Sequence, residues 1–305
     1  MKIVISGGTG FVGSILTEAL VKRGHRVTVL ARAVRKDSAI SEGALLVGYD
    51  PAKSGSWQQS VAESDVIINL AGASIFRRWT PKAKKEIFDS RIFTTRHIVE
   101  ALSYRKDKKI HFFSISGVGY YGFSGDNILD ESSPAGSDFL AQVAAAWESE
   151  ALRARELGVR VVLCRLGHVL GSGGGVLRKF VTISNLHLAS RWGNGQQWLS
   201  WIHREDLANI FLFLLDHQEL EGPFNLTSPN PVRNKEMLTV LGQLLGKNSY
   251  VPPIPGFLLR LILREFATVF LKGQRVVPRR IVDSGFRFKY PILDEALRDL
   301  LKRPK

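Results

Sequence analysis

The first half of the chain alternates short apolar runs with longer segments in which apolar residues recur every three or four positions. Continuous apolar runs predict strands that are buried on both faces; they occupy 2–6, 26–31, 65–70, 110–116 and 159–165, with a weaker run at 45–48. Helical periodicity covers 11–23, 80–104 and 138–157. This alternation predicts an α/β fold built on a doubly wound parallel sheet.

The second half is less regular. The pattern predicts a glycine loop at 167–175, a strand at 198–202, a loop at 225–231, and helices at 203–216, 235–245 and 257–271, with Asn234 as the N-cap of the second of these helices. The Pro252–Pro255 segment is the best linker candidate. We therefore expect an epimerase-like domain over 1–250, with its nucleotide-binding core at 1–166, and a small, mostly helical domain over 251–303.

Composition narrows the possible functions. The 305 residues are 45% hydrophobic, which suits a globular protein with a large core. The single cysteine, Cys164, excludes an internal disulfide and a zinc-cysteine cluster, so no metal site is expected. The first predicted strand begins at residue 2, which leaves no room for a signal peptide and favours a cytoplasmic protein.

The net charge of +14 invites an anionic partner. The basic residues are dispersed and accompany no nucleic-acid-binding motif, so we expect solvated faces and an anionic small-molecule substrate rather than nucleic acid. Membrane association through 257–271 and the basic tail is a weaker alternative. Monomer and homodimer both stay open.

A glycine-rich turn follows the first strand directly. Gly7, Gly10 and Gly13 stand at three-residue spacing between this strand and the first helix. Backbone N–H groups and the positive end of the helix dipole make such a turn suitable for a pyrophosphate, and glycine permits close approach. The position between strand and helix favours a dinucleotide site over a turn without a ligand.

The end of the second strand indicates which dinucleotide binds. An acidic residue there favours NAD, whereas a basic one accommodates the 2′-phosphate of NADP. Arg32, Arg35 and Lys36 follow this strand, and no acidic residue stands between the end of the strand and Asp37. Because arginine grips phosphate with paired hydrogen bonds, we predict NADP(H). The alternative is a merely solvated basic loop.

These motifs together resemble a known family. The segments that carry the resemblance are Gly7–Gly13, Asn69–Gly72, Arg77–Trp79, Ser90-Arg91, Ser116–Gly122, Trp147-Glu148, Arg165–Gly167, Trp201–His203, Ser228–Asn234 and Gly273–Arg275. The whole chain is similar to an atypical epimerase-type branch of the extended short-chain dehydrogenases/reductases, whose members are described as sugar-nucleotide epimerases or cell-division-inhibitor-like proteins. The resemblance implies a Rossmann fold, NADP(H) as cofactor and a small C-terminal helical domain.

The resemblance also assigns cofactor contacts. It places the phosphates at the glycine turn, the adenosine at the second strand, and the rest of the cofactor along the fourth strand, the long helix and the segment after the sixth strand. The implied residues are Gly7, Thr9, Gly10, Phe11, Val12, Gly13, Ala31, Arg32, Leu70, Ala71, Glu86, Arg91 and Val169.

The family's usual catalytic set is incomplete in this chain. Such enzymes hold the substrate oxygen with Ser or Thr and move its proton with a Tyr, whose pKa a Lys four residues later lowers. Ser116 takes the serine position, but Leu140 and Ala144 stand where Tyr and Lys are expected. Tyr120 and Tyr121 are the first substitute candidates.

His168 and His203 are further substitutes, although each of the four residues also has a structural interpretation: a packed ring for the tyrosines, a helix cap for His203 and a loop position for His168. On the substrate side, the glycines at 171–175 suit either a phosphate site or a lid. Trp198 or Trp201 suits stacking on a ring, and Arg191, Asn194, Gln196 and Gln197 suit polar recognition.

Two functions fit these features. The first is an NADP(H)-dependent epimerase or oxidoreductase acting on a small carbonyl compound or nucleotide sugar by hydride transfer. The second is an NADP(H)-binding regulatory or scaffold protein that lacks catalysis, which the missing Tyr and Lys favour.

Overall fold

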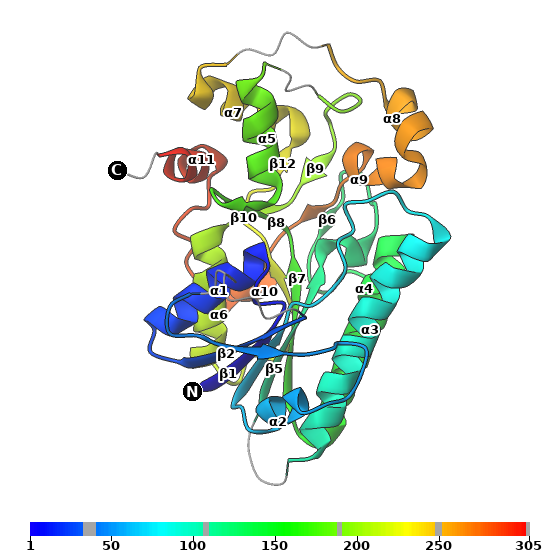
Figure 1. The fold of residues 1–305 in the computed structure, drawn as a ribbon. Helices are drawn as coiled ribbons and strands as arrows, with labels where there is room; N and C mark the ends of the chain where they lie inside the picture. The colour runs from blue at the N-terminus through cyan, green and yellow to red at the C-terminus, as the bar shows by residue number, and fades with distance from the viewer. Residues whose placement is uncertain (33–40, 106–109, 188–190, 248–251, 303–305) are drawn as a thin grey trace.

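The computed structural model describes residues 1–32, 41–105, 110–187, 191–247 and 252–302 (Figure 1). One parallel sheet forms its centre, with the strand order β11-β7-β5-β4-β1-β2-β3. Its strands are β1 (Lys2–Ser6), β2 (Arg26–Ala31), β3 (Leu45–Gly48), β4 (Val66–Asn69), β5 (His111–Gly117), β7 (Arg160–Leu166) and β11 (Gly222–Leu226). The doubly wound α/β fold is therefore confirmed.

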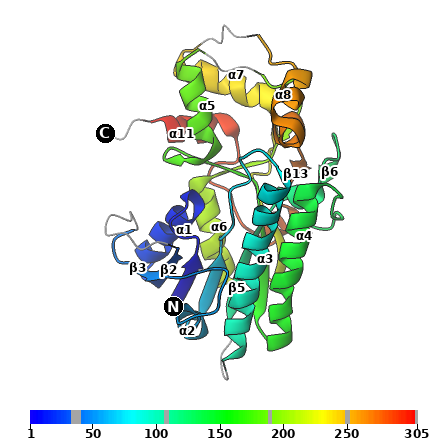
Figure 2. The same cartoon turned by 45° about the vertical axis from the view of Figure 1, so that its right-hand side comes forward.

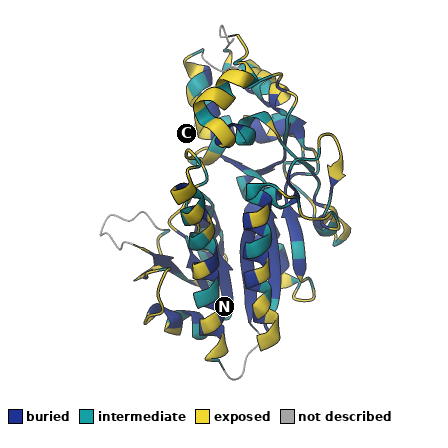
Figure 3. Ribbon diagram, turned by 90° about the vertical axis from the view of Figure 1, so that its right-hand side faces the viewer, coloured by how far each residue is buried: buried dark blue, intermediate teal, exposed yellow. Residues whose placement is uncertain are grey.

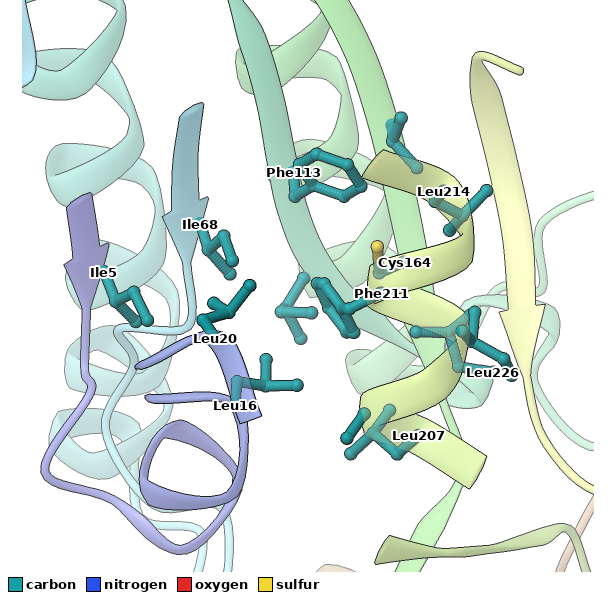
Figure 4. Packing of buried hydrophobic residues seen from close by; sticks show 14 of the residues in the cluster. Ile5, Leu16, Leu20, Ile68, Phe113, Cys164, Leu207, Phe211, Leu214 and Leu226 are labelled. Carbon is teal, nitrogen blue, oxygen red and sulfur yellow. The ribbon is translucent and has the colours of Figure 1, made fainter. Parts of the chain in front are cut away.

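The two faces of the sheet are covered by different helices. Residues such as Ile5, Ile68 and Cys164 point to one face, where they pack against α1 (Phe11–Lys22) and α6 (Arg204–Asp216). Figure 4 shows Leu16 and Leu20 of α1, and Leu207, Phe211 and Leu214 of α6, in this layer. Burial on both faces explains the continuous apolar strands (Figure 3).

The opposite face carries the alternate strand residues. Val4, Ile67 and Phe112 pack there against α2 (Trp57–Ala62), α3 (Pro81–Ser103) and α4 (Phe139–Leu152), which continues as the 3₁₀ turn η2 (Arg153–Leu157). The beginnings of the two long helices follow from their sequences. Thr80 caps α3 by accepting a hydrogen bond from the Ala83 N–H at 3.1 Å, and Asp138 caps α4 through the N–H groups of its first turn.

A second lobe sits over the carboxyl ends of the strands (Figure 2). It contains β8 (His168–Gly171), α5 (Gly175–Asn185), β9 (Trp198–Leu199), β10 (Trp201–His203), β12 (Val232–Arg233), α7 (Asn234–Leu245), α8 (Gly256–Leu263), η3 (Arg264–Ala267), α9 (Thr268–Leu271) and α11 (Leu293–Leu301). Leu177, Trp201, Met237 and Leu297 belong to its hydrophobic cluster. Because this cluster joins α5, α7 and α11, the C-terminal helix completes the core of the lobe.

The remaining elements tie the two lobes together. β13 (Arg275–Val276) pairs with β6 (Ile128–Leu129), beyond the 3₁₀ turn η1 (Val118–Tyr121). α10 (Arg279–Asp283) packs on β11 through the fully buried Ile281. Residues after 251 thus contribute to several cores. No helix among the described residues is long and apolar enough to cross a bilayer.

Several local predictions were wrong. The glycine loop at 167–175 contains the strand β8, and 225–226 belong to the strand β11. The predicted helix at 257–271 is broken at Arg264, whose φ of 52° is left-handed. Arg233 rather than Asn234 occupies the N-cap position of α7.

Candidate functional site

The glycine turn has the geometry of a close-packed anion cradle. Gly7 has a φ of +74°, which favours glycine, and its carbonyl accepts the Gly10 N–H at 3.1 Å. A Cβ on Gly13 would lie 2.4 Å from the Gly7 oxygen, so only glycine lets α1 begin this close to the turn. Gly10 provides no side chain to cap α1, which leaves the first N–H groups of the helix available to an anion.

The neighbouring strand ends surround this turn. A Cβ on Gly7 would lie 3.0 Å from the Leu70 carbonyl carbon, so Leu70 and Ala71 directly adjoin the turn. Ala31 is buried at the end of β2, and Arg32 is exposed just beyond it. Arg35 and Lys36 lie outside the described residues.

Phe11, the first residue of α1, links the turn to the upper lobe. A Cβ on Gly171, Gly174 or Gly175 would come within 2.7–2.8 Å of an atom of the Phe11 ring. These three glycines therefore form a socket for the ring, at a tight turn in which Gly171 bridges to Gly174. The glycines of this loop pack against a ring from α1, a role that the sequence did not suggest.

A cavity of about 370 Å³ lies between the lobes at the carboxyl ends of the strands. Residues of the glycine turn, of β5 and the turn after it, of α4 and of the upper lobe line it: Phe11, Val12, Ile75, Phe76, Arg91, Ser116, Gly117, Val118, Gly119, Phe123, Leu140, Val143, Ala144, Trp147, Leu166, Gly167, His168, Val169, Gly175, Val176, Phe180, Trp192, Gln197, Trp198, Leu199, Asn234, Val269, Phe270, Lys272, Gly273 and Gln274. This position is where ligands bind to open α/β sheets.

Four expected cofactor residues belong to this lining, namely Phe11, Val12, Arg91 and Val169. The Arg91 Nη1 donates to the carbonyl oxygens of Ala73 at 3.0 Å and Ile87 at 2.9 Å. Burial lowers the pKa of Arg91 to about 10. Glu86 is half-buried and does not line the cavity; its Oε2 forms an ion pair with Arg77 Nη1 at 2.8 Å.

Ser116 connects the cavity to a buried polar network. Its hydroxyl donates to Glu148 Oε1 at 2.5 Å. Arg165 holds both oxygens of the same carboxylate, at 2.9 Å through Nε and at 2.8 Å through Nη2. Because the Ser116 hydroxyl hydrogen is engaged in the hydrogen bond to Glu148, Ser116 can only accept a hydrogen bond from a group in the cavity.

Tyr121 belongs to the same network but not to the cavity lining. Its hydroxyl accepts from Arg165 Nη1 at 2.9 Å and donates to Asn225 Oδ1 at 2.7 Å. Burial raises the pKa of Tyr121 to about 12. Tyr120 covers the Arg165 guanidinium, 3.5 Å from its ring centroid. These contacts give both tyrosines a structural role around Arg165, and neither lines the cavity.

The two histidines lie in different surroundings. His203 caps α6, where its Nδ1 accepts the Glu205 N–H at 3.1 Å, as expected from the sequence. His168 lies at the start of β8 and lines the cavity with Ser116. The Nδ1 of His168 is 3.2 Å from the Ser200 carbonyl oxygen. A carbonyl only accepts, so Nδ1 carries the hydrogen and Nε2 is left as the acceptor.

The two positions at which the usual catalytic Tyr and Lys are missing lie in the cavity wall. Leu140 and Ala144, in the places of Tyr and Lys, both line the cavity on α4. Of the polar residues expected for recognition, only Gln197 lines it, and Trp201 is fully buried in the upper lobe. The sequence analysis did not identify Phe180 and Phe270 as lining residues, because apolar periodicity does not distinguish a cavity wall from a hydrophobic core.

Comparison with known proteins assigns the chain to a family. Residues 3–227 match the model of the NAD dependent epimerase/dehydratase family, and the chain belongs to this family, as predicted. Residues 254–300 match a domain of unknown function, DUF1731.

The relatives resemble the chain over nearly its full length. The epimerase family protein SDR39U1 homolog, chloroplastic, of Arabidopsis thaliana is 40% identical over 99% of this chain and 87% of its own. The epimerase family protein YfhF of Bacillus subtilis is 36% identical over 99% of this chain and 98% of its own. A crystal structure of human epimerase family protein SDR39U1 (isoform2) with NADPH has a TM-score of 0.85 at 30% identity and covers 100% of both chains.

Proposed function

We propose that the protein binds NADP(H) and catalyses hydride transfer to or from a small carbonyl or alcohol substrate, as an epimerase or oxidoreductase. The observation that carries this proposal is the uncapped start of α1 at the Gly7–Gly13 turn, which opens beside a cavity that also holds Ser116. The NADPH in the human relative's structure supports the choice of cofactor. When bound, the cofactor supplies or accepts the hydride.

Residues at the carboxyl edge of the sheet would hold the pyrophosphate and the 2′-phosphate of the cofactor. The free N–H groups of the α1 start suit the pyrophosphate, and Arg32 stands exposed at the end of β2 for the 2′-phosphate. Val169 lines the cavity, as Ser116 does. These positions all belong to the carboxyl edge of the sheet, which is the binding edge in this architecture.

Proton transfer falls to His168 in this proposal. Among Tyr120, Tyr121, His168 and His203, only His168 lines the same cavity as Ser116. Burial lowers the pKa of His168, which keeps the ring neutral near pH 7 and its Nε2 able to take a hydroxyl proton. Ser116, whose hydroxyl is fixed by donating to Glu148, lines the same cavity and limits where the substrate oxygen can lie, while the single hydroxyl hydrogen goes to His168.

The test combines binding and turnover. Calorimetry with NADPH and NADH measures the cofactor preference. Absorbance at 340 nm follows the net reduction of carbonyl compounds by NADPH and the oxidation of alcohols by NADP⁺, and NMR follows the epimerisation of nucleotide sugars, in which the hydride returns and the absorbance does not change. We expect tight NADPH binding and turnover that His168→Gln removes without weakening NADPH binding. The lack of NADPH binding at millimolar concentration refutes the proposal.

A second function is favoured by one observation. Leu140 and Ala144 give the cavity an apolar wall where the family's proton-transferring pair is expected. A protein of this kind binds NADPH as a regulatory or scaffold protein without chemistry. Tight NADPH binding with no turnover across the whole panel selects this alternative.

A further inference from the structure

The cavity wall is dominated by aromatic rings that support one another. Phe180 and Trp192 have ring centroids 5.5 Å apart, and Trp192 lies 4.8 Å from Phe270. Phe266 backs Phe270 at 5.1 Å from behind the wall. The contacts among Phe180, Trp192 and Phe270 join α5, the segment before β9 and α9 in one aromatic wall of the cavity that Ser116 also lines, and such a wall suits a ligand with a flat apolar body.

The charged groups of the lining offer little to a diphosphate. No aspartate or glutamate lines the cavity in the described part of the chain, and its cations are Arg91 and Lys272. Arg91 is committed to two backbone carbonyls, and its guanidinium lies 5.1 Å from the Trp147 ring. Lys272 lies 5.2 Å from the centroid of Phe123. Lys272 is thus the cation left to meet a ligand's negative charge.

Two arginines that contact the lining residue Trp198, one on β12 and one on β13, do not line the cavity themselves. Arg233 and Arg275 both lie on the Trp198 ring, at 4.1 Å and 4.6 Å from its centroid. Arg233 is also paired with Asp126 at 2.8 Å.

The second glycine turn adds no charged side chain to the cavity. Its glycines at 171, 174 and 175 adjoin the Phe11 ring, and Gly175 lines the cavity. Burying two phosphate charges against such a wall carries a desolvation penalty with little to offset it.

From these contacts we infer that the substrate is an uncharged, ring-containing secondary alcohol with an apolar body, which is oxidised to the ketone, rather than a nucleoside diphosphate sugar. Its hydroxyl donates its hydrogen to His168 Nε2 in the cavity that Ser116 also lines, and its body lies against the Phe180–Trp192–Phe270 wall. This inference rests on the proposed function, because it concerns the same cavity. It also replaces the expectation of an anionic substrate.

The experiment titrates the NADPH-loaded protein, in which an alcohol cannot be oxidised, by calorimetry with three uncharged secondary alcohols, cyclohexanol, 2-tetralol and 2-decalol, and in parallel with UDP-glucose. We expect affinity to rise with the apolar area of the alcohol, because burial of apolar surface is favourable. UDP-glucose is expected not to bind. Tighter binding of UDP-glucose than of 2-decalol, or no binding of any of the three alcohols, overturns the inference.

A charge-matched pair of variants locates the effect. Val269→Asp places a carboxylate in the lining of the cavity, whereas Val282→Asp places it on α10, where Val282 is exposed. We expect Val269→Asp to weaken 2-decalol binding by about tenfold or more, because a charge is costly beside an apolar ligand. Both variants are titrated at saturating NADPH, so a change in cofactor affinity does not enter the comparison. Equal 2-decalol affinity in the two overturns the inference.

Turnover separates this inference from the proposed function. It is measured with NADP⁺, so that the hydride passes from the alcohol to the cofactor and the hydroxyl proton to His168. If 2-decalol binds as expected but absorbance at 340 nm shows no formation of NADPH with any compound, hydride transfer fails while the inference about the ligand stands. If UDP-glucose alone is converted, the proposed function stands and the inference fails.

Discussion

Replacing Gly174 with alanine tests whether the Phe11 socket maintains the cofactor turn. The new Cβ would lie 2.7 Å from Phe11 Cδ2, whereas ordinary contacts begin at 3.4 Å, so the ring must move by at least 0.7 Å. The backbone at Gly174 is extended with a φ of 179°, so alanine adds no backbone strain and the effect is purely steric. Overpacking of this kind costs about 1–3 kcal/mol.

The part of the shift that the Phe11 side-chain torsions do not absorb passes to its backbone, which is the start of α1. If about 1.4 kcal/mol of that cost falls on the bound state, NADPH affinity drops about tenfold. Calorimetry measures the affinity, and urea denaturation measures the free energy of unfolding. Gly173→Ala is the matched control, because no heavy atom lies within 4 Å of its Cβ position.

A compensating substitution sharpens this test. Phe11→Leu in the Gly174→Ala background removes the clashing ring edge, so it restores part of the lost stability if the clash is with Phe11. Indistinguishable NADPH affinities for the alanine variants at 173 and 174 would refute the socket's role in holding the turn.

The remaining predictions concern charges. Glu148→Gln leaves the buried Arg165 without its countercharge, so urea denaturation should show that the free energy of unfolding falls by about 3–5 kcal/mol. Glu18→Gln, at an exposed ion pair, should lower it by only about 0–1 kcal/mol. Equal losses in the two variants contradict the structural role given to the buried pair. Burial lowers the pKa of His203 from 6.5 to about 4, so the unfolded chain binds a proton that the folded protein refuses and stability falls as pH drops from 6.5 towards 4. His203→Asn keeps a capping side chain and should flatten that stretch of the stability–pH curve; an unchanged slope counts against it. Arg32→Asp should shift the calorimetric preference from NADPH towards NADH, and an unchanged ratio places the 2′-phosphate elsewhere.

The sheet could be predicted because its strands obey a local rule. Val66–Asn69 is apolar almost throughout because both faces of β4 are covered, and that signal needs no knowledge of its partners. The glycine turn was similarly readable, since Gly7 and Gly13 stand between a strand and a helix. Family membership followed from motifs placed on these elements.

The cavity could not be read in the same way. The glycines at 171–175 suggested a phosphate site or a lid, because the ring that fills their socket comes from Phe11, far away in the chain. Ser116 and Glu148 meet only because β5 and α4 pack side by side. The break at Arg264 has no local signal, since the apolar periodicity continues across it.

The one cysteine of the chain makes the opening of the core measurable through the rate at which its thiol is labelled. Cys164 is completely buried in the middle of β7, and burial raises the pKa of its thiol, so a reagent such as DTNB meets no reactive group in the native protein. Each labelling event therefore reports an opening of the central sheet. The labelling rate, compared with that of the urea-unfolded chain, yields the free energy of that opening without any engineered probe.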